Sequence, residues 1–162
     1  MKSGVVSLRR PRPGDYGRVV ALHGELYARE FGYDGRFEAL VAGIVAEFVD
    51  NFNARRERCW IAVMGGDVVG SVFLVQKSPT VAKLRLLIID PKARGQGLGR
   101  RLTQACMRFA KEKKYRKIVL WTQSHLGAAR AIYQAEGFRR TASEKHFSFG
   151  KRLVAETWEL KL

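Results

Sequence analysis

The sequence predicts an α/β fold, in which helices cover both faces of one mixed β-sheet. Three observations support this prediction. Segments with helical apolar spacing alternate along the chain with short β-rich apolar runs. One of these runs, at residues 80–90, becomes wholly apolar toward its end, as a strand covered on both faces does. No linker, low-complexity tract or internal repeat interrupts the 162 residues, so we expect a single domain over residues 1–162.

The N-terminal third predicts one strand and two helices. "GVVSLRR", at residues 4–10, has strand character and is closed by Pro11. Asp15 is placed to cap a first helix, which "EFGYDG" at residues 30–35 interrupts with two glycines. The apolar face of this helix consists of Val19, Leu22, Leu26 and Tyr27. The second helix has apolar positions at Leu40, Val41, Ile44, Val45, Phe48 and Phe52.

The rest of the chain predicts the other strands and two more helices. "RCWIAVM" (58–64) and "VVGSVFLVQ" (68–76) flank a Gly-Gly-Asp turn, which is typical of a hairpin. The next strand, "TVAKLRLLIID" at 80–90, stops at Pro91. A helix then carries Leu98, Leu102, Ala105, Cys106 and Phe109 on one face. It is followed by a strand at 117–122, a short helix at 126–138 and two last strands at 146–150 and 153–162, so the sheet is expected to have seven strands.

Charge and cysteine content limit the classes of protein to be considered. Thirty Lys and Arg against 15 Asp and Glu leave a formal charge of +15, which attracts nucleic acid, an anionic cofactor or an acidic partner. Cys59 and Cys106 each lie in an apolar segment, which favours two buried free thiols over a disulfide or a metal site. No apolar run has the roughly 18–20 residues of a membrane span. The start, "MKSGVVSLRR", lacks a secretory signal, so a cytoplasmic protein is expected.

The segment "IIDPKARGQGLGRRL", at residues 88–102, has an unusual glycine spacing. It is not a dinucleotide fingerprint, because its glycines run Gly-x-Gly-x-Gly and Val119 stands where an acid is needed. It also lacks the Gly-Lys-Ser/Thr of a P-loop. Glycines at a helix start let backbone N–H groups turn toward an anion, and Arg94, Arg100 and Arg101 add positive charge. The segment therefore predicts a pyrophosphate cradle, with a plain connecting turn as the alternative.

With "AARAIYQAEGF" at residues 128–138, this segment resembles the GCN5-related N-acetyltransferases, the GNAT superfamily. The hallmark of that family, Arg/Gln-x-x-Gly-x-Gly/Ala, is matched by Arg94, Gly97 and Gly99. "LWTQSHLGAARAIYQAEGF" and the ending "ETWELKL" are most similar to acetyltransferase domains that are fused elsewhere to MarR-type DNA-binding domains. These residues contain no winged helix-turn-helix, so DNA binding is not expected from that likeness.

The resemblance implies a GNAT fold with acetyl-CoA held in a splayed cleft between strands. Through its motifs, the expected cofactor-binding residues are Leu87, Ile88, Ile89, Arg94, Gly95, Gln96, Gly97, Leu98, Gly99, Arg100, Leu126 and Ala129. Leu126 departs from the family, which often has Asn there. Tyr133 would lie near the sulfur and act as general acid, because a phenol with a pKa of about 10 stays protonated at neutral pH. Packing of Tyr133 in the core is the alternative.

The expected acceptor is the primary amine of a small, amino-acid-like molecule. A lysine-like amine is only about 0.1% neutral at pH 7.4, so a base is needed for such a substrate. Glu30 is the candidate base, and Glu25 and His125 are weaker candidates. The alternative for both glutamates is a solvated charge on the helix face, and for His125 a surface loop residue. Some relatives carry a glutamate base on the strand before the cradle, where this chain has Lys83 and Arg85. If these cations face the cleft, they would repel polyamines and attract a carboxylate or phosphate.

Two other functions remain compatible with the sequence. A nucleic-acid or ribosome-associated protein with a degenerate acetyltransferase fold would explain the charge and "KEKKYRK" at residues 111–117. No aromatic residues alternate with that cluster, however, as a base-stacking surface requires, so a nucleic-acid partner is disfavoured. An acyl-CoA-sensing module would bind the cofactor without turnover. The C-terminal strands also predict an exposed sheet edge at which a homodimer can form.

Overall fold

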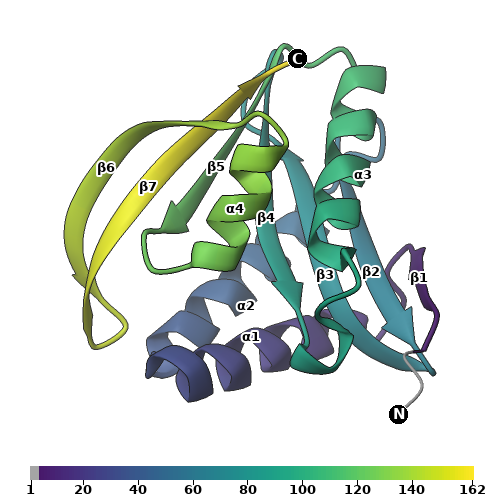
Figure 1. The fold of residues 1–162 in the computed structure, drawn as a ribbon. Helices are drawn as coiled ribbons and strands as arrows, with labels where there is room; N and C mark the ends of the chain where they lie inside the picture. The colour runs from purple at the N-terminus through teal and green to yellow at the C-terminus, as the bar shows by residue number, and fades with distance from the viewer. Residues whose placement is uncertain (1–3) are drawn as a thin grey trace.

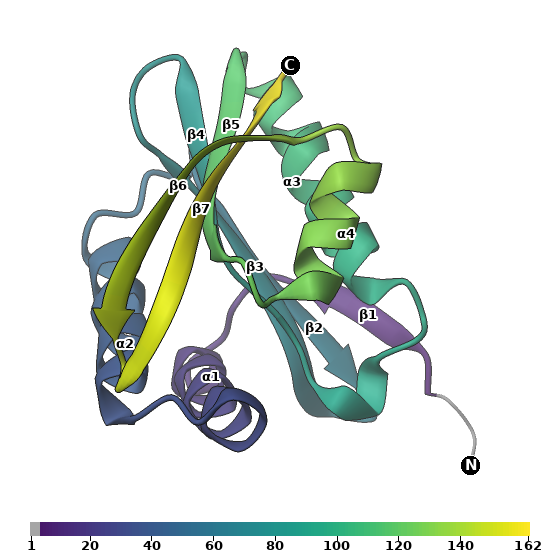
Figure 2. The ribbon, with the colours of Figure 1, turned by 60° about the vertical axis from the view of Figure 1, so that its left-hand side comes forward.

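The computed structural model describes residues 4–162 and confirms the predicted α/β architecture (Figure 1). Within this range, seven strands form one open mixed sheet in the order β1-β2-β3-β4-β5-β7-β6. The helices α1 and α2 cover one face of the sheet, and α3 and α4 cover the other (Figures 1 and 2). Residues 1–3, which belong to the segment used to predict the absence of a secretory signal, lie outside the described residues. No helix in the described range is long and apolar enough to span a membrane.

The elements follow the predicted order. The strands are β1 (Val6–Arg9), β2 (Arg58–Met64), β3 (Asp67–Gln76), β4 (Val81–Ile89), β5 (Lys117–Gln123), β6 (Arg139–Ser148) and β7 (Lys151–Lys161). The helices are α1 (Asp15–Phe31), α2 (Gly35–Asp50), the short 3-10 helix η1 (Pro91–Ala93), α3 (Leu98–Glu112) and α4 (Gly127–Ala135). The β2–β3 turn has Gly65 and Gly66 at φ of 58° and 84°, the left-handed values that a two-residue hairpin turn requires.

The two layers of helices bury separate apolar clusters against the sheet. The α3 side includes Leu102, Cys106 and Phe109, the face predicted from helical spacing. The α1–α2 side includes Val19 and Phe48 together with residues of β2 and β3. Cys59 and Cys106 are both buried and free, as predicted, and burial raises the pKa of each thiol. The sheet is therefore covered on both faces, which explains the apolar character of its central strands.

Two sequence predictions about the elements were wrong. The strand expected at residues 146–150 begins at Arg139, because it pairs along nearly its whole length with β7. This strand lies at the edge of the sheet and is mostly exposed, so its residues show no apolar alternation. The residue that caps α1 is Gly14 rather than Asp15, which is the first residue of the helix.

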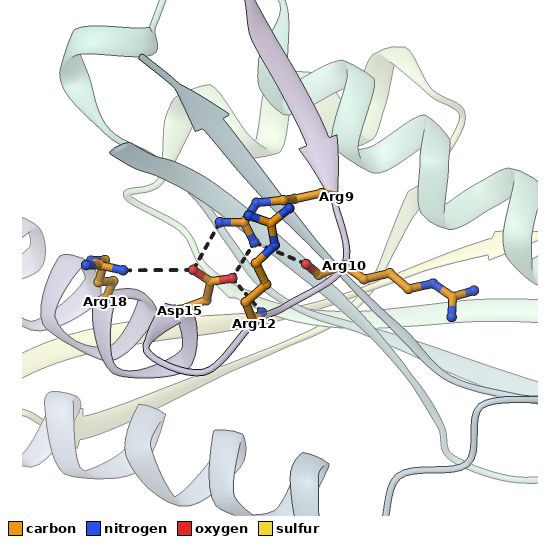
Figure 3. A network of polar contacts seen from close by, with 5 residues as sticks. All are labelled: Arg9, Arg10, Arg12, Asp15 and Arg18. Atoms are coloured by element: carbon orange, nitrogen blue, oxygen red, sulfur yellow. Dashed lines mark hydrogen bonds and ion pairs between the residues drawn. The ribbon is translucent and has the colours of Figure 1, made fainter. Parts of the chain in front are cut away.

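The carboxylate of Asp15 instead fastens the end of β1 to the start of α1 (Figure 3). It is 2% exposed, accepts hydrogen bonds from the Arg9 guanidinium, and accepts one from the backbone N–H of Arg12 at 2.7 Å. Arg18 lies 4.0 Å from the other side of the carboxylate. Burial alone would raise the pKa of Asp15, but the bonds from Arg9 and Arg12 outweigh it, so the pKa lies below its usual value.

We predict that Asp15→Asn lowers the free energy of unfolding at pH 7 by about 1–3 kcal/mol, because the Arg9 guanidinium and the Arg12 N–H lose their charged, buried acceptor. Since the pKa is lowered in the folded state, the contribution of Asp15 is complete above the unfolded pKa of about 3.9 and is lost as pH falls through the folded value. Urea denaturation at pH 7 and pH 3 measures this difference. Arg18→Gln, at an exposed partner 4.0 Å away, is the control and should change stability by less than about 0.5 kcal/mol. If Asp15→Asn lowered the free energy of unfolding equally at both pH values, the ionised Asp15 carboxylate would not be the stabilising group.

Candidate functional site

The site begins where two neighbouring parallel strands separate. β4 pairs with β5 only from Val81–Lys117 to Leu84–Leu120. Beyond this point β4 stays paired with β3, while β5 stays paired with β7 through Gln123. The facing backbone edges of β4 and β5 are therefore unpaired with each other toward the carboxyl ends of the strands (Figure 1). This is the position at which open α/β sheets bind ligands.

A bulge in β4 accompanies the separation. Between the pairs Phe73–Arg85 and Ser71–Ile88, β4 has one more residue than β3. Leu86 has a φ of 53°, an uncommon value for a residue that is not glycine. The buried Ser71 hydroxyl donates a hydrogen bond to the Leu86 carbonyl at 2.9 Å and so holds the bulge. Sequence reasoning missed Ser71, because a single serine in an apolar strand carries no signal of a bulge on the neighbouring strand.

The glycine segment leads from β4 into α3 and presents backbone donors. Gly95 and Gly97 have φ of 79° and 70°, and a Cβ at either position would meet no other atom within 4 Å. Gly97 is also the N-cap of α3. None of the backbone N–H groups from Gly95 to Arg100 donates a hydrogen bond to a residue in the described range. The loop is therefore open, left-handed at two glycines, and positioned at the positive end of the helix dipole, which suits an anion.

A groove runs from this loop along β4 and past the start of α4; we call it the glycine-loop groove. It is lined by Leu26, Tyr27, Glu30, Phe31, Leu87, Ile88, Ile89, Arg94, Gly99, His125, Leu126, Gly127, Ala128, Ala129 and Ile132. The structure thus brings together seven of the residues expected to bind the cofactor: Leu87, Ile88, Ile89, Arg94, Gly99, Leu126 and Ala129. A Cβ at Gly99 would come within 2.7 Å of Ile132 Cδ1, so α3 and α4 approach closely at this point.

The other predicted cofactor residues lie outside the lining of the groove. Gly95, Gln96 and Gly97 form the exposed loop next to it. The side chain of Leu98 is buried in the core, so only its backbone N–H is available to a ligand. The Arg100 guanidinium donates one hydrogen bond, from Nε to Glu136 at 2.6 Å, and the side chain remains exposed.

Glu30 and Arg94 form an ion pair across the groove. Arg94 donates two hydrogen bonds to the Glu30 carboxylate, at 2.7 and 3.1 Å, from its two terminal nitrogens. This contact raises the pKa of Arg94. It links α1 to the glycine segment, which are 64 positions apart in the chain. The candidate base and the candidate phosphate-binding arginine are therefore partners in this structure.

A second cavity lies beside the groove, between the helices α1 and α2 and the separated strands; we call it the aromatic cavity. It is lined by His23, Tyr27, Tyr33, Phe37, Leu40, Val41, Ile44, Lys83, Leu84, Arg85, Leu86, Leu87, Trp121, Thr122, Gln123, Leu126, Ala129, Tyr133 and Phe149. It shares Tyr27, Leu87, Leu126 and Ala129 with the glycine-loop groove. The two spaces therefore adjoin at the bulge of β4.

Tyr133 lies in the wall of the aromatic cavity. Its ring packs against Phe138 and Trp158, with ring centroids 5.7 and 6.4 Å away, so packing is part of its role. Its hydroxyl makes no hydrogen bond within residues 4–162, yet no side-chain oxygen in that range is both fully enclosed and unpaired. The hydroxyl is therefore reachable from the cavity that the residue lines. Burial raises the pKa of Tyr133, and the nearby Tyr27 raises it further, so the phenol is protonated at neutral pH.

Two histidines belong to the site, although His125 also reads as a surface residue from sequence. His125 is exposed, lines the glycine-loop groove, and lies 2.6 Å through Nε2 from the Tyr33 hydroxyl. Partial burial lowers its pKa, and the charge of Lys151 lowers it further, so the imidazole is neutral at pH 7 and shares a hydrogen bond with the Tyr33 hydroxyl. His23 donates from Nδ1 to the Val19 carbonyl at 2.8 Å, and burial lowers its pKa to about 4. The site therefore holds two neutral imidazoles.

Lys83 and Arg85 both line the aromatic cavity and are half-buried. Both side chains therefore face the cleft, as the sequence left open. Glu25 is exposed on α1 and lines neither space. No cluster of His, Cys, Asp or Glu in the described range could hold a metal ion. The arrangement combines an anion-binding loop, a groove, a protonated phenol and a cationic aromatic cavity.

Comparison with known proteins places this geometry in a family. The family model described as the acetyltransferase (GNAT) family matches residues 21–138. Human N-acetyltransferase 8 is 31% identical over 117 residues, covering 68% of this chain and 51% of the relative. Mycothiol acetyltransferase from Amycolatopsis mediterranei (strain U-32) is 30% identical over 158 residues, covering 88% of this chain and 49% of the relative. The chain thus spans about half the length of these curated relatives.

Solved structures agree with the family match in fold. An acetyltransferase from Streptococcus agalactiae has a TM-score of 0.79 and 23% identity, and each chain is covered completely. The Salmonella typhimurium protein yncA, solved with its cofactor acetyl-CoA, has a TM-score of 0.78 and 15% identity, covering 96% of this chain and 93% of the other. At these identities the likeness establishes a shared fold, including the open seven-stranded sheet.

Proposed function

Because the chain belongs to the GNAT acetyltransferase family, we propose that it transfers the acetyl group of acetyl-CoA to the primary amine of a small, amino-acid-like molecule. One observation carries the proposal: the open N–H groups of the glycine loop lie at one end of a groove whose other end meets the cavity that contains Tyr133. A diphosphate binder and a proton donor are thereby joined by one continuous surface.

The residues of the groove fit acetyl-CoA by their chemistry. Backbone N–H groups from Gly95 to Arg100 would hold the diphosphate, with Arg94 as the added charge. The unpaired edge of β4 at Leu87–Ile89 would hydrogen-bond the amide-containing arm, and Leu126 and Ala129 would cover it from α4. The co-substrate supplies the activated thioester. The leucine at position 126 offers apolar contact where the family often uses an amide.

Tyr133 is proposed as the general acid. The amine nitrogen forms a bond to the acetyl carbon, the carbon–sulfur bond breaks, and the thiolate takes the phenolic proton of Tyr133. The nitrogen releases two protons over the reaction: one restores the phenol and the other leaves through a base. The raised pKa keeps the Tyr133 phenol protonated at neutral pH, which a general acid requires before it donates.

Glu30 is proposed as the base. Its ion pair with Arg94 limits when it can take up a proton. Arg94 occupies both oxygens of the carboxylate, so Glu30 can accept a proton only after Arg94 turns to another partner. The diphosphate assigned to Arg94 is such a partner. Binding of acetyl-CoA would then release the base, which couples cofactor capture to proton transfer.

We predict that Gly97→Ala weakens acetyl-CoA binding tenfold or more, because a Cβ at a φ of 70° is strained and would turn the loop N–H groups away. Calorimetry with acetyl-CoA measures the change. Gly66→Ala is the matched control: it has a φ of 84° and equally open surroundings, but lies in the β2–β3 turn. Equal affinity of Gly97→Ala and the wild type would contradict a backbone cradle for the diphosphate.

We predict that Tyr133→Phe lowers kcat by about 10²–10⁴-fold while acetyl-CoA binds normally, because only the proton donor is removed. Release of the free thiol in the presence of an amine panel measures turnover. Tyr16→Phe, at another half-buried tyrosine outside both spaces, is the control. A wild type that binds acetyl-CoA but releases no thiol with any amine would instead identify a sensing module. Nucleic-acid binding that falls steeply with salt, without thiol release, would favour the other alternative.

We predict that Glu30→Gln lowers kcat by about 10²-fold or more, because an amide cannot take up the proton. It should also tighten acetyl-CoA binding, because Arg94 no longer has to leave an ion pair to reach the diphosphate. The kinetic constants for both substrates measure this, with Glu25→Gln as the control on the exposed face of the same helix. A changed affinity for acetyl-CoA with an unchanged kcat would show that Glu30 only orients Arg94.

A further inference from the structure

Two cations without counter-ions lie in the wall of the aromatic cavity. Lys83 and Arg85 are two positions apart on β4, so both side chains leave the same face of the strand. Neither forms an ion pair with any residue in the range 4–162. The charge of Glu47 acts on both from beyond ion-pair distance, and no Asp or Glu lines the cavity. A molecule that enters therefore meets uncompensated positive charge.

The partial burial of these cations favours an anionic ligand. Burial lowers the pKa of both Lys83 and Arg85, and the charge of Arg85 lowers that of Lys83 further. Each cation has thus lost hydration without gaining a partner. A carboxylate would restore the lost interactions through charge-assisted hydrogen bonds, and a guanidinium offers the parallel donors that match its two oxygens. Arg85 is closer in sequence than Lys83 to Leu87, where the groove and the cavity meet.

Aromatic side chains, together with aliphatic ones, line most of the rest of the cavity. Tyr27 and Phe37 stack with their ring centroids 4.4 Å apart, and Tyr33 and Phe149 stack at 5.2 Å. Trp121, on β5, lines the same cavity but leaves 48% of its surface exposed. These rings come from α1, the α1–α2 connection, α2, β5 and the β6–β7 turn. Such a wall favours a flat apolar group, because ring–ring contacts add to the burial of apolar area.

We propose that the acceptor amine carries both a carboxylate and an aromatic ring, as the aromatic amino acids do. The carboxylate would bind Arg85, with Lys83 as a second cation, and the ring would pack on the aromatic wall. This inference rests on the proposed acetyl transfer to an amine. Glutamate would place a second carboxylate against apolar rings at a desolvation cost, and a polyamine would meet two like charges.

The test compares L-phenylalanine with 2-phenylethylamine, which differ only by the carboxylate. The ratio of their kcat/KM values is measured for the wild type and for Arg85→Gln. Dividing the two ratios cancels the different pKa values of the two amines. We expect the wild-type ratio to exceed the variant ratio about tenfold or more, the size expected for a lost hydrogen bond to a charged group. Arg55→Gln, which removes an exposed arginine away from both spaces, should leave the ratio unchanged.

Two further comparisons test the ring and the fold of the variant. L-Phenylalanine should exceed L-glutamate and spermidine in kcat/KM, and Trp121→Ala should reduce this preference for phenylalanine over glutamate. Arg85→Lys keeps the charge and should retain part of the carboxylate effect if Arg85→Gln loses it. Equal ratios in the wild type and Arg85→Gln, or a clear preference for glutamate or spermidine, would overturn the inference.

A separate binding measurement distinguishes this inference from the proposed function. Calorimetry with N-acetyl-L-phenylalanine measures ligand binding in the cavity without turnover. Arg85→Gln should weaken the binding of this ligand about tenfold. Binding that depends on Arg85, without acetyl transfer to any amine, would contradict the proposed acetyltransferase activity and support Arg85 as a carboxylate-binding residue. Acetyl transfer to amines that does not depend on Arg85 would support the acetyltransferase activity and contradict the role of Arg85.

Discussion

The separation of β4 from β5 is the constraint on which the rest of the site depends. Two parallel strands that stayed paired would satisfy each other's backbone groups and leave no room between them. Here pairing stops after Leu84 and Leu120, at the bulge that Ser71 holds through the Leu86 carbonyl. The opening creates an unpaired strand edge on one side and a cavity on the other. The glycine loop and Tyr133 both lie along this opening.

The site divides its chemistry between backbone and side chains. At the glycine loop the donors are main-chain N–H groups, so the loop needs glycine conformations more than particular side chains. In the aromatic cavity the discriminating groups are side chains, which can change without disturbing the sheet. Under the proposed function, this division would let the acceptor change while acetyl-CoA binding is kept. The ion pair between Glu30 and Arg94 connects α1 to the glycine segment.

Positions where sequence and structure differ share a physical cause. The edge strand β6 was predicted too short, because a strand exposed on both faces has no apolar alternation to mark it. Asp15 looked like a cap because its residue type and place before an apolar stripe are those of a cap. Its buried carboxylate instead accepts hydrogen bonds from the Arg9 guanidinium and the Arg12 backbone N–H, which precede the helix. The contact between Arg100 Nε and Glu136, at the end of α4, likewise has no signal in the sequence.

The sequence by itself determined the order of the elements, the two-sided burial of the sheet and the glycine loop at the start of α3. These features are encoded locally, by apolar periodicity and by residues that permit left-handed backbone. Only the tertiary structure decided the bulge at Leu86, the partners of Glu30 and His125, and the entry of Lys83 and Arg85 into an aromatic cavity. Each of these depends on groups that are far apart in the chain and meet only when the sheet closes around its core.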